Sequence, residues 1–133
     1  MSQLLQMSRR SGKPPRKLSQ VDFSATPNGW YRIAFSKDIK KGKVRTVHYF
    51  GQDWVIFRGE SGSLAVVEPF CPHLGAHLGV KSEVKGDDLL CGFHGWGFNQ
   101  KGELASVPLA KRLPQNVCLK KMEVIERYGV VFV

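Results

Sequence analysis

Two short segments that combine cysteine with histidine constrain this chain more than any other feature. Cys71 and His73 form the first pair, Cys91 and His94 form the second, and together they read C-x-H-x17-C-x-x-H. Glycines surround both pairs, and a glycine adopts the positive φ values of tight turns at little cost. Thiolate and imidazole groups are metal ligands. The pattern therefore predicts two loops that close on a metal centre.

The spacing inside each pair indicates whether its two side chains bind the same metal ion or two different ones. Residues i and i+2 of an extended segment point the same way, so Cys71 and His73 can face one cofactor. A single spacer is awkward for closing both side chains on one metal ion, and binding is easier when each side chain takes a different metal. A zinc site is the alternative, although zinc arms usually read C-x2–4-C and H-x3–5-H. Chance spacing without a metal is the second alternative.

The motif and its surroundings resemble the Rieske family. Residues 91–98 read C-G-F-H-G-W-G-F, which is similar to the C-x-F-H-G-W-x-F stretch of Rieske oxygenases. Residues 101–110 are similar to the proline-containing stretch that follows in these proteins. The resemblance covers residues 29–133. It implies a [2Fe–2S] cluster whose two irons are held by two cysteines, Cys71 and Cys91, and by two histidines, His73 and His94.

The resemblance also implies the surroundings of the cluster. We expect four residues to shield it from water: Pro72, Leu74, Trp96 and Pro108. Ala76 and Phe93 stand where respiratory members have a disulfide that ties the two loops. Trp96 replaces a serine of those members, and hydrogen bonds near the sulfurs influence the reduction potential. We therefore expect a potential at the low end of the roughly −150 to +300 mV Rieske range.

Short β-rich segments separated by turns predict an all-β fold. We expect strands at residues 30–35, 44–50, 54–58, 64–68, 122–126 and 129–133, and a single helical turn at 36–41. β-branched and aromatic residues favour strands, and such frequent turns favour an antiparallel β-sandwich or barrel. The resemblance places a small rubredoxin-like cluster-binding subdomain at about residues 69–98.

The N-terminal residues differ in composition from the rest. Residues 1–27 are rich in basic residues, serine and proline, so we expect a basic, disordered tail. Residues 28–133 are predicted to form the Rieske domain.

Charge alone does not identify a partner. The formal net charge is +9, and a second basic cluster spans residues 37–45. A basic face can be merely solvated, can receive an acidic electron donor, or can bind nucleic acid. The sequence contains no helix-turn-helix, RNP-like or zinc-finger pattern. We therefore expect no nucleic-acid partner.

Three cysteines are present, and the motif uses two of them. Cys118 is left over, so no disulfide can form within the chain, and we expect it to be a small buried hydrophobic residue. No apolar run reaches the ~18 residues that cross a bilayer, and no secretory signal is evident. We expect a cytoplasmic protein with no membrane span.

Two histidines remain outside the motif. We expect His77 to be a partly exposed neighbour of the cluster, and His48 to be a structural histidine with a hydrogen-bond partner. The resemblance implies that complete oxygenases also carry a mononuclear iron on two histidines and a carboxylate. His48 and His77 cannot form such a site convincingly, so we expect this chain to lack it.

These patterns favour one-electron transfer through a low-potential Rieske cluster, by a ferredoxin or by the Rieske domain of an aromatic-ring or steroid-type oxygenase system. The alternative is an N-terminal fragment of a complete Rieske monooxygenase. A structural zinc module and a nucleic-acid-binding barrel are the rival classes. The resemblance implies a reductase or ferredoxin as electron donor, and an oxygenase catalytic domain as acceptor.

Overall fold

A computed structural model describes residues 26–133, and the tail predicted at residues 1–27 falls almost entirely outside this range. The described residues form strands and one 3-10 turn, with no α-helix among them. The elements are β1 (Arg32–Phe35), η2 (Ser36–Asp38), β2 (Val44–Tyr49), β3 (Gln52–Arg58), β4 (Leu64–Val67), β5 (Glu83–Lys85), β6 (Asp88–Leu90), β7 (Gly97–Phe98), β8 (Leu104–Ser106), β9 (Lys121–Met122), β10 (Ile125–Arg127) and β11 (Val130–Phe132). The predicted all-β class is confirmed.

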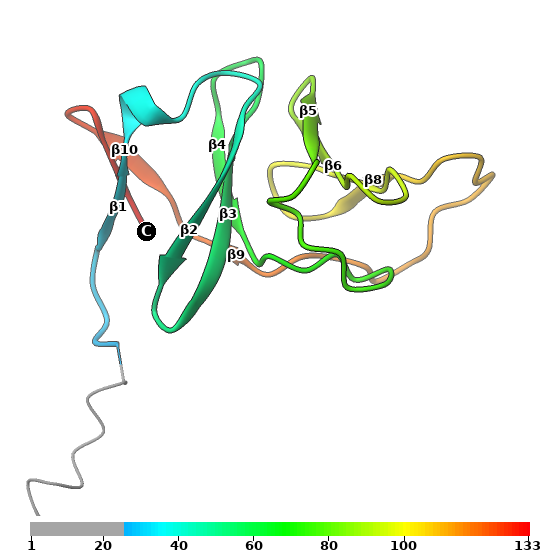
Figure 1. Ribbon diagram of the computed structural model, residues 1–133, viewed down its shortest axis with the longest axis horizontal. Coiled ribbons are helices and arrows are strands. Elements are labelled where there is room, and N and C mark those ends of the chain that lie inside the picture. Colours follow the sequence, from blue (N-terminus) through cyan, green and yellow to red (C-terminus); the bar gives the residue numbers. More distant parts are fainter. Residues whose placement is uncertain (1–25) are drawn as a thin grey trace, which may run out of the picture.

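The strands form three antiparallel sheets. The strand orders are β1-β11-β10, β2-β3-β4-β9 and β5-β6-β7-β8. In Figure 1 the β2-β3-β4-β9 sheet lies between the other two. The strands predicted at residues 44–50 and 54–58 are present and form a hairpin, in which Val44 pairs with Phe57 and Tyr49 with Gln52.

Strands β3 and β4 of the middle sheet are buried on both faces. Successive strand residues point to opposite faces, and β3 uses this alternation fully. Ile56 packs in a core with the β1-β11-β10 sheet. Val55 and Phe57 pack in a second core that also contains Cys71 and Cys91. Each such fully buried side chain contributes about 1.5–3 kcal/mol, so β3 connects the sandwich to the cysteine loops.

Arg58, at the end of β3, ties separate parts of the sandwich together. Its guanidinium donates to the carbonyl oxygens of Ile39 at 2.7 Å and of Gly62 at 2.8 Å. It also forms a two-pronged ion pair with Glu126 of β10, at 2.9 and 3.0 Å. The Arg58 side chain is only 11% exposed. The pair therefore crosses from the middle sheet to the β1-β11-β10 sheet in a partly dry setting.

The predicted single strand at residues 122–126 is wrong. Lys121–Met122 pairs with β4 in the middle sheet, whereas Ile125–Arg127 pairs with β11 in its neighbour. The chain crosses between the two sheets at residues 123–124, which the local β-propensity could not reveal. The predicted helical turn at residues 36–41 is present only as the 3-10 turn Ser36–Asp38.

The predicted burial of Cys118 is also wrong, because this cysteine is exposed. It forms an isolated antiparallel bridge with Glu103. The next residue, Leu119, is 3% exposed and belongs to the core. Side chains alternate along an extended segment, so burial of Leu119 turns Cys118 towards solvent.

We predict that Glu126→Gln lowers the free energy of unfolding by about 1 kcal/mol at neutral pH, since a charge-assisted pair is replaced by a neutral one. Arg58 holds the pKa of Glu126 below its ordinary value of 4.5. The pair therefore stabilises the fold above that pH and loses its effect as the pH falls through the lowered pKa. Urea unfolding at pH 7 and pH 3 measures both effects. Equal losses for the variant at the two pH values would contradict this role.

Candidate metal centre

The two predicted ligand loops share one backbone hydrogen-bond pattern. In the first, the N–H of Cys71 donates to the carbonyl oxygen of Ala76, and the N–H of Gly75 donates to Cys71, both at 2.8 Å. In the second, the N–H of Cys91 donates to Trp96 at 2.8 Å, and Gly95 donates to Cys91 at 3.0 Å. Each cysteine thus begins a closed turn whose fifth residue is glycine.

Both turns depend on a glycine with positive φ. The φ angles are 78° at Gly75 and 73° at Gly95, a region in which other residues are strained. Gly95 also lies under Pro108, because an added Cβ would be 3.1 Å from the proline ring. The β6–β7 pair then frames the second loop, with Leu90 opposite Gly97.

The two cysteines lie together on the inner side of the loops. Cys71 is 2% exposed and Cys91 is 5% exposed, and both belong to the core beneath β3. Burial raises the pKa of the Cys71 thiol, and the nearby Cys91 adds to the increase. The backbone N–H groups of His73 and Leu74 are hydrogen-bonded to the Cys71 sulfur and act in the opposite direction. Such N–H groups favour a thiolate once a metal has displaced the proton.

The two histidines lie together on the outer side. The ring centroids of His73 and His94 are 4.7 Å apart, with the rings nearly perpendicular. Trp96 stacks on His73 at 4.4 Å and an interplanar angle of 12°. Phe93 lies beside His94, with a centroid separation of 3.9 Å. The structure therefore brings the imidazoles together, and His94 is exposed while His73 is partly exposed.

The predicted shielding residues differ in their positions. Trp96 is half-buried against His73, and Pro108 covers Gly95. Pro72 and Leu74 are exposed on the first loop, with Leu74 at 69%. Shielding of a cluster by these four residues stays a prediction.

A close contact joins the two loops. A Cβ on Gly92 would overlap the carbonyl oxygen of Lys81, so the backbones meet where only glycine fits. The N–H of Gly92 donates to the hydroxyl oxygen of Ser82 at 3.2 Å. Lys81 itself has a positive φ of 56°. This contact connects the loops without a disulfide, and all three cysteines of the described chain are free thiols.

Asp53 attaches the first loop to the sandwich through His77, and it also pairs with His48 on the neighbouring strand. Asp53 of β3 contacts His77 Nε2 at 3.1 Å and His48 Nδ1 at 2.8 Å. The N–H of Gly79 donates to His77 Nδ1 at 3.0 Å, which places the ring proton on Nε2, facing Asp53. The hydrogen bond from His48 lowers the pKa of Asp53, and the one from His77 adds to this. Sequence reasoning missed Asp53, since nothing in its local pattern marks it.

The two histidines outside the motif, His48 and His77, differ in their exposure to solvent. The His77 side chain is 24% exposed and His48 is 68% exposed. His48 has the expected hydrogen-bond partner, but it lies at the surface. His77 is partly exposed on the first loop, as predicted. Gly79 packs against β2 as well, because an added Cβ would overlap the Thr46 hydroxyl.

The arrangement suits a two-iron cofactor. Two buried sulfurs lie on one side and two imidazoles on the other, each loop contributing one of each. This is the donor set of a [2Fe–2S] cluster with two cysteines on one iron and two histidines on the other. Among residues 26–133, no three histidine, cysteine, aspartate or glutamate side chains converge to hold a single metal ion.

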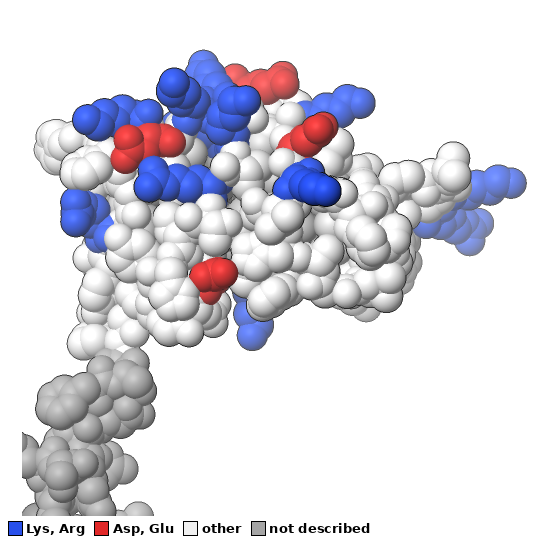
Figure 2. Space-filling model, in the orientation of Figure 1, with Lys and Arg blue, Asp and Glu red and all other residues white. Residues whose placement is uncertain are grey.

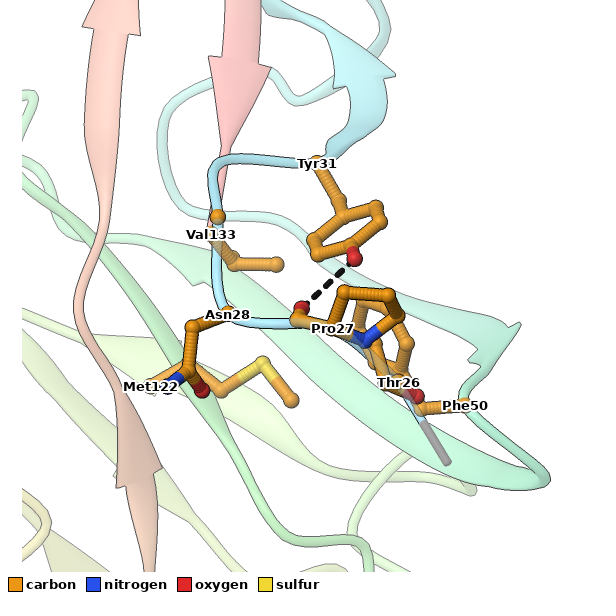
Figure 3. Close-up of a pocket in the computed structure, with 8 residues that line it drawn as sticks. Thr26, Pro27, Asn28, Tyr31, Phe50, Met122 and Val133 are labelled. Carbon is orange, nitrogen blue, oxygen red and sulfur yellow. Dashed lines mark hydrogen bonds between the residues drawn. The ribbon is translucent and has the colours of Figure 1, made fainter. Parts of the chain in front are cut away.

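A separate apolar hollow lies at the other end of the sandwich (Figure 3). Tyr31, Phe50, Met122 and Val133 line it, and the Tyr31 hydroxyl donates to the carbonyl oxygen of Pro27. None of the four predicted ligands lines it.

The structure contains no membrane-spanning helix within residues 26–133.

The fold and the paired loops agree with a match to the Rieske [2Fe–2S] domain family over residues 29–122. The chain belongs to this family, whose cofactor is a Rieske-type [2Fe–2S] cluster. The match favours the cluster over the zinc site that the sequence left open.

Relatives with known activities are longer than this chain. The oxygenase component of 3-ketosteroid-9-alpha-monooxygenase from Rhodococcus rhodochrous is 41% identical over 121 residues, which cover 88% of this chain and 32% of the relative. Cholesterol 7-desaturase from Ciona intestinalis is 39% identical over 108 residues, covering 80% of this chain and 24% of the relative. The chain therefore spans about a quarter to a third of these proteins.

Solved structures show the same fold. A chain in the reduced complex between oxygenase and ferredoxin in carbazole 1,9a-dioxygenase superposes with a TM-score of 0.67 and 30% identity, covering 79% of this chain and 28% of that one. Dicamba monooxygenase gives a TM-score of 0.72 over 79% of this chain and 33% of its own. At 23% identity, the latter likeness concerns the fold alone.

We predict that Gly92→Ala weakens cofactor incorporation, because the new Cβ forces the two loops apart at the Lys81 carbonyl. Overpacking of this kind costs about 1–3 kcal/mol. Iron content per chain and visible absorbance should fall. Gly29→Ala is the matched control, since its Cβ meets only Tyr31 at 4.0 Å. Equal iron content in wild type and Gly92→Ala would contradict the tight contact.

Proposed function

We propose that this chain transfers single electrons through a low-potential Rieske cluster held by Cys71, Cys91, His73 and His94. The observation that carries the proposal is the pair of matching loops, which presents two buried sulfurs and two outward imidazoles. When bound, the cluster accepts and releases one electron at a time.

The residues of the two loops have separate tasks in this proposal. Cys71 and Cys91 would supply the thiolates of one iron, and their burial in the core keeps water away. His73 and His94 would supply the imidazoles of the other iron. Because His94 is exposed and His73 partly so, these rings form the side from which a partner protein can exchange the electron. Trp96 fixes the plane of His73 by stacking.

Three residues support a potential at the low end of the Rieske range. Ala76, Phe93 and Trp96 carry no hydroxyl group, so none of these side chains can donate an O–H hydrogen bond to a cluster sulfur. Such donors raise the potential by stabilising the added negative charge. The Trp96 ring instead packs against His73.

The relatives support a place in an oxygenase system. We propose a ferredoxin or reductase as donor, and an oxygenase catalytic domain with a mononuclear iron as acceptor, in a cytoplasmic, steroid-type system. The identity to a 3-ketosteroid-9-alpha-monooxygenase component supports the substrate class. The alternative is the N-terminal part of a complete Rieske monooxygenase. This alternative is supported as well, because the chain matches only a quarter to a third of the length of these relatives.

We predict that His73→Cys and His94→Cys each lower the midpoint potential, by an amount on the order of 100 mV, because an anionic thiolate replaces a neutral imidazole. Protein-film voltammetry on the reconstituted chain measures this shift. The same substitution at an exposed histidine outside the loops, His48→Cys, should leave the potential unchanged. Unchanged potentials in both loop variants would remove His73 and His94 from the ligand set.

A further inference from the structure

The three segments around the loops contain no acidic residue. Residues 69–82, 89–102 and 104–122 hold six basic residues and no aspartate or glutamate: Lys81, Lys101, Lys111, Arg112, Lys120 and Lys121. The basic cluster at residues 37–45 includes one acid, Asp38, which pairs with Arg45 at 3.5 Å. Both regions are therefore positively charged, and the acidic residues near the loops, Glu83, Asp87, Asp88 and Glu103, lie between the three segments.

Large apolar side chains are exposed on the two loops and on the segment that packs against the second loop. Leu74 beside His73 is 69% exposed, Phe93 beside His94 is 65% exposed, and Leu109 is fully exposed. Single exposed apolar residues are ordinary, but a group of them marks an interaction site. These three residues belong to three different segments.

The segment that carries Leu109 is held against the second loop. Pro108 packs on Gly95, and the N–H of Ala110 donates to the carbonyl oxygen of Val107 at 3.2 Å. Within this turn Leu109 has a φ of 61°, a conformation that is uncommon for leucine. The strained turn directs an apolar side chain outward, just before Lys111 and Arg112. Strained backbone of this kind is found at binding sites.

From these observations we infer that Leu74, Phe93 and Leu109, together with Lys111 and Arg112, form the docking surface for an acidic one-electron donor protein. This inference rests on the proposed function and names the donor's contact surface. The donor would place an apolar centre on the leucines and the phenylalanine, and acidic side chains on the two cations. The transfer oxidises the donor by one electron and reduces the cofactor by one, without forming or breaking a bond.

The charge distribution supports this occupant. Lys111 and Arg112 form no ion pair within residues 26–133, so both charges are available. In Figure 2 basic side chains stand at the tip of the projecting β8–β9 connection, and no acidic atoms lie beside it in this view. An acidic partner is attracted to such a surface, and a basic one is repelled.

The test compares two charge reversals in the reconstituted chain. Stopped-flow measures the rate at which a reduced plant-type [2Fe–2S] ferredoxin of net negative charge reduces each variant, across a range of ionic strength. The first variant is Lys111→Glu/Arg112→Glu. The control, Lys37→Glu/Lys40→Glu, makes the same change of charge in the cluster at residues 37–45. Both pairs of side chains are exposed.

We expect the first variant to lose about tenfold or more in rate at low salt, since steering by charge has this size. The loss should shrink as salt screens the charges, and the control should change much less. Leu109→Ser should slow reduction at all salt concentrations. Equal effects of the two reversals, or no effect of the first, would overturn the docking surface.

The same samples separate this inference from the proposed function. Reduction by dithionite to an EPR endpoint does not require a protein donor. A normal endpoint with rates insensitive to the first reversal refutes only the docking surface. A chain without a Rieske signal refutes the proposed function itself.

Discussion

Burial of the β3–β4 ladder on both faces is the constraint on which the rest of this structure depends. Alternate residues of the two strands enter two different cores, so the ladder is shared by the sandwich and the cysteine loops. Cys71 and Cys91 lie in the same core as Val55 and Phe57. The sulfurs are therefore positioned by hydrophobic packing, and the histidines, two and three residues further on, reach the surface.

The buried side and the outer side of the loops have different roles: the first stabilises the loops, and the second is accessible for electron exchange with a partner. The buried side of the loops is fixed by Asp53 against His77, by the Gly92–Lys81 contact and by the core. The outer side presents imidazole rings and exposed apolar side chains. An electron carrier requires both properties, because its cofactor must be held rigidly and dry while one edge remains within reach of a donor. Membership of the Rieske family agrees with this arrangement.

Much of the fold and of the site could be predicted from local sequence. The β2–β3 hairpin follows from its β-branched and aromatic residues, and the Cys/His spacing indicated both loops. Two predictions were wrong because they depended on tertiary contacts. The chain crosses between sheets at residues 123–124, and Cys118 points to solvent because its neighbour Leu119 is buried in the core. Asp53 and the Gly92 contact were invisible for the same reason, since their partners are distant in sequence. The ligand set itself is still a prediction.

The most direct test of this account is the EPR spectrum of the dithionite-reduced chain, with iron and acid-labile sulfide measured on the same sample. The account predicts a rhombic signal with a low average g value, and two irons with two sulfides per chain. A silent spectrum from a sample that contains zinc and no sulfide would contradict it, and would leave the β-sheet architecture without its proposed electron-transfer function.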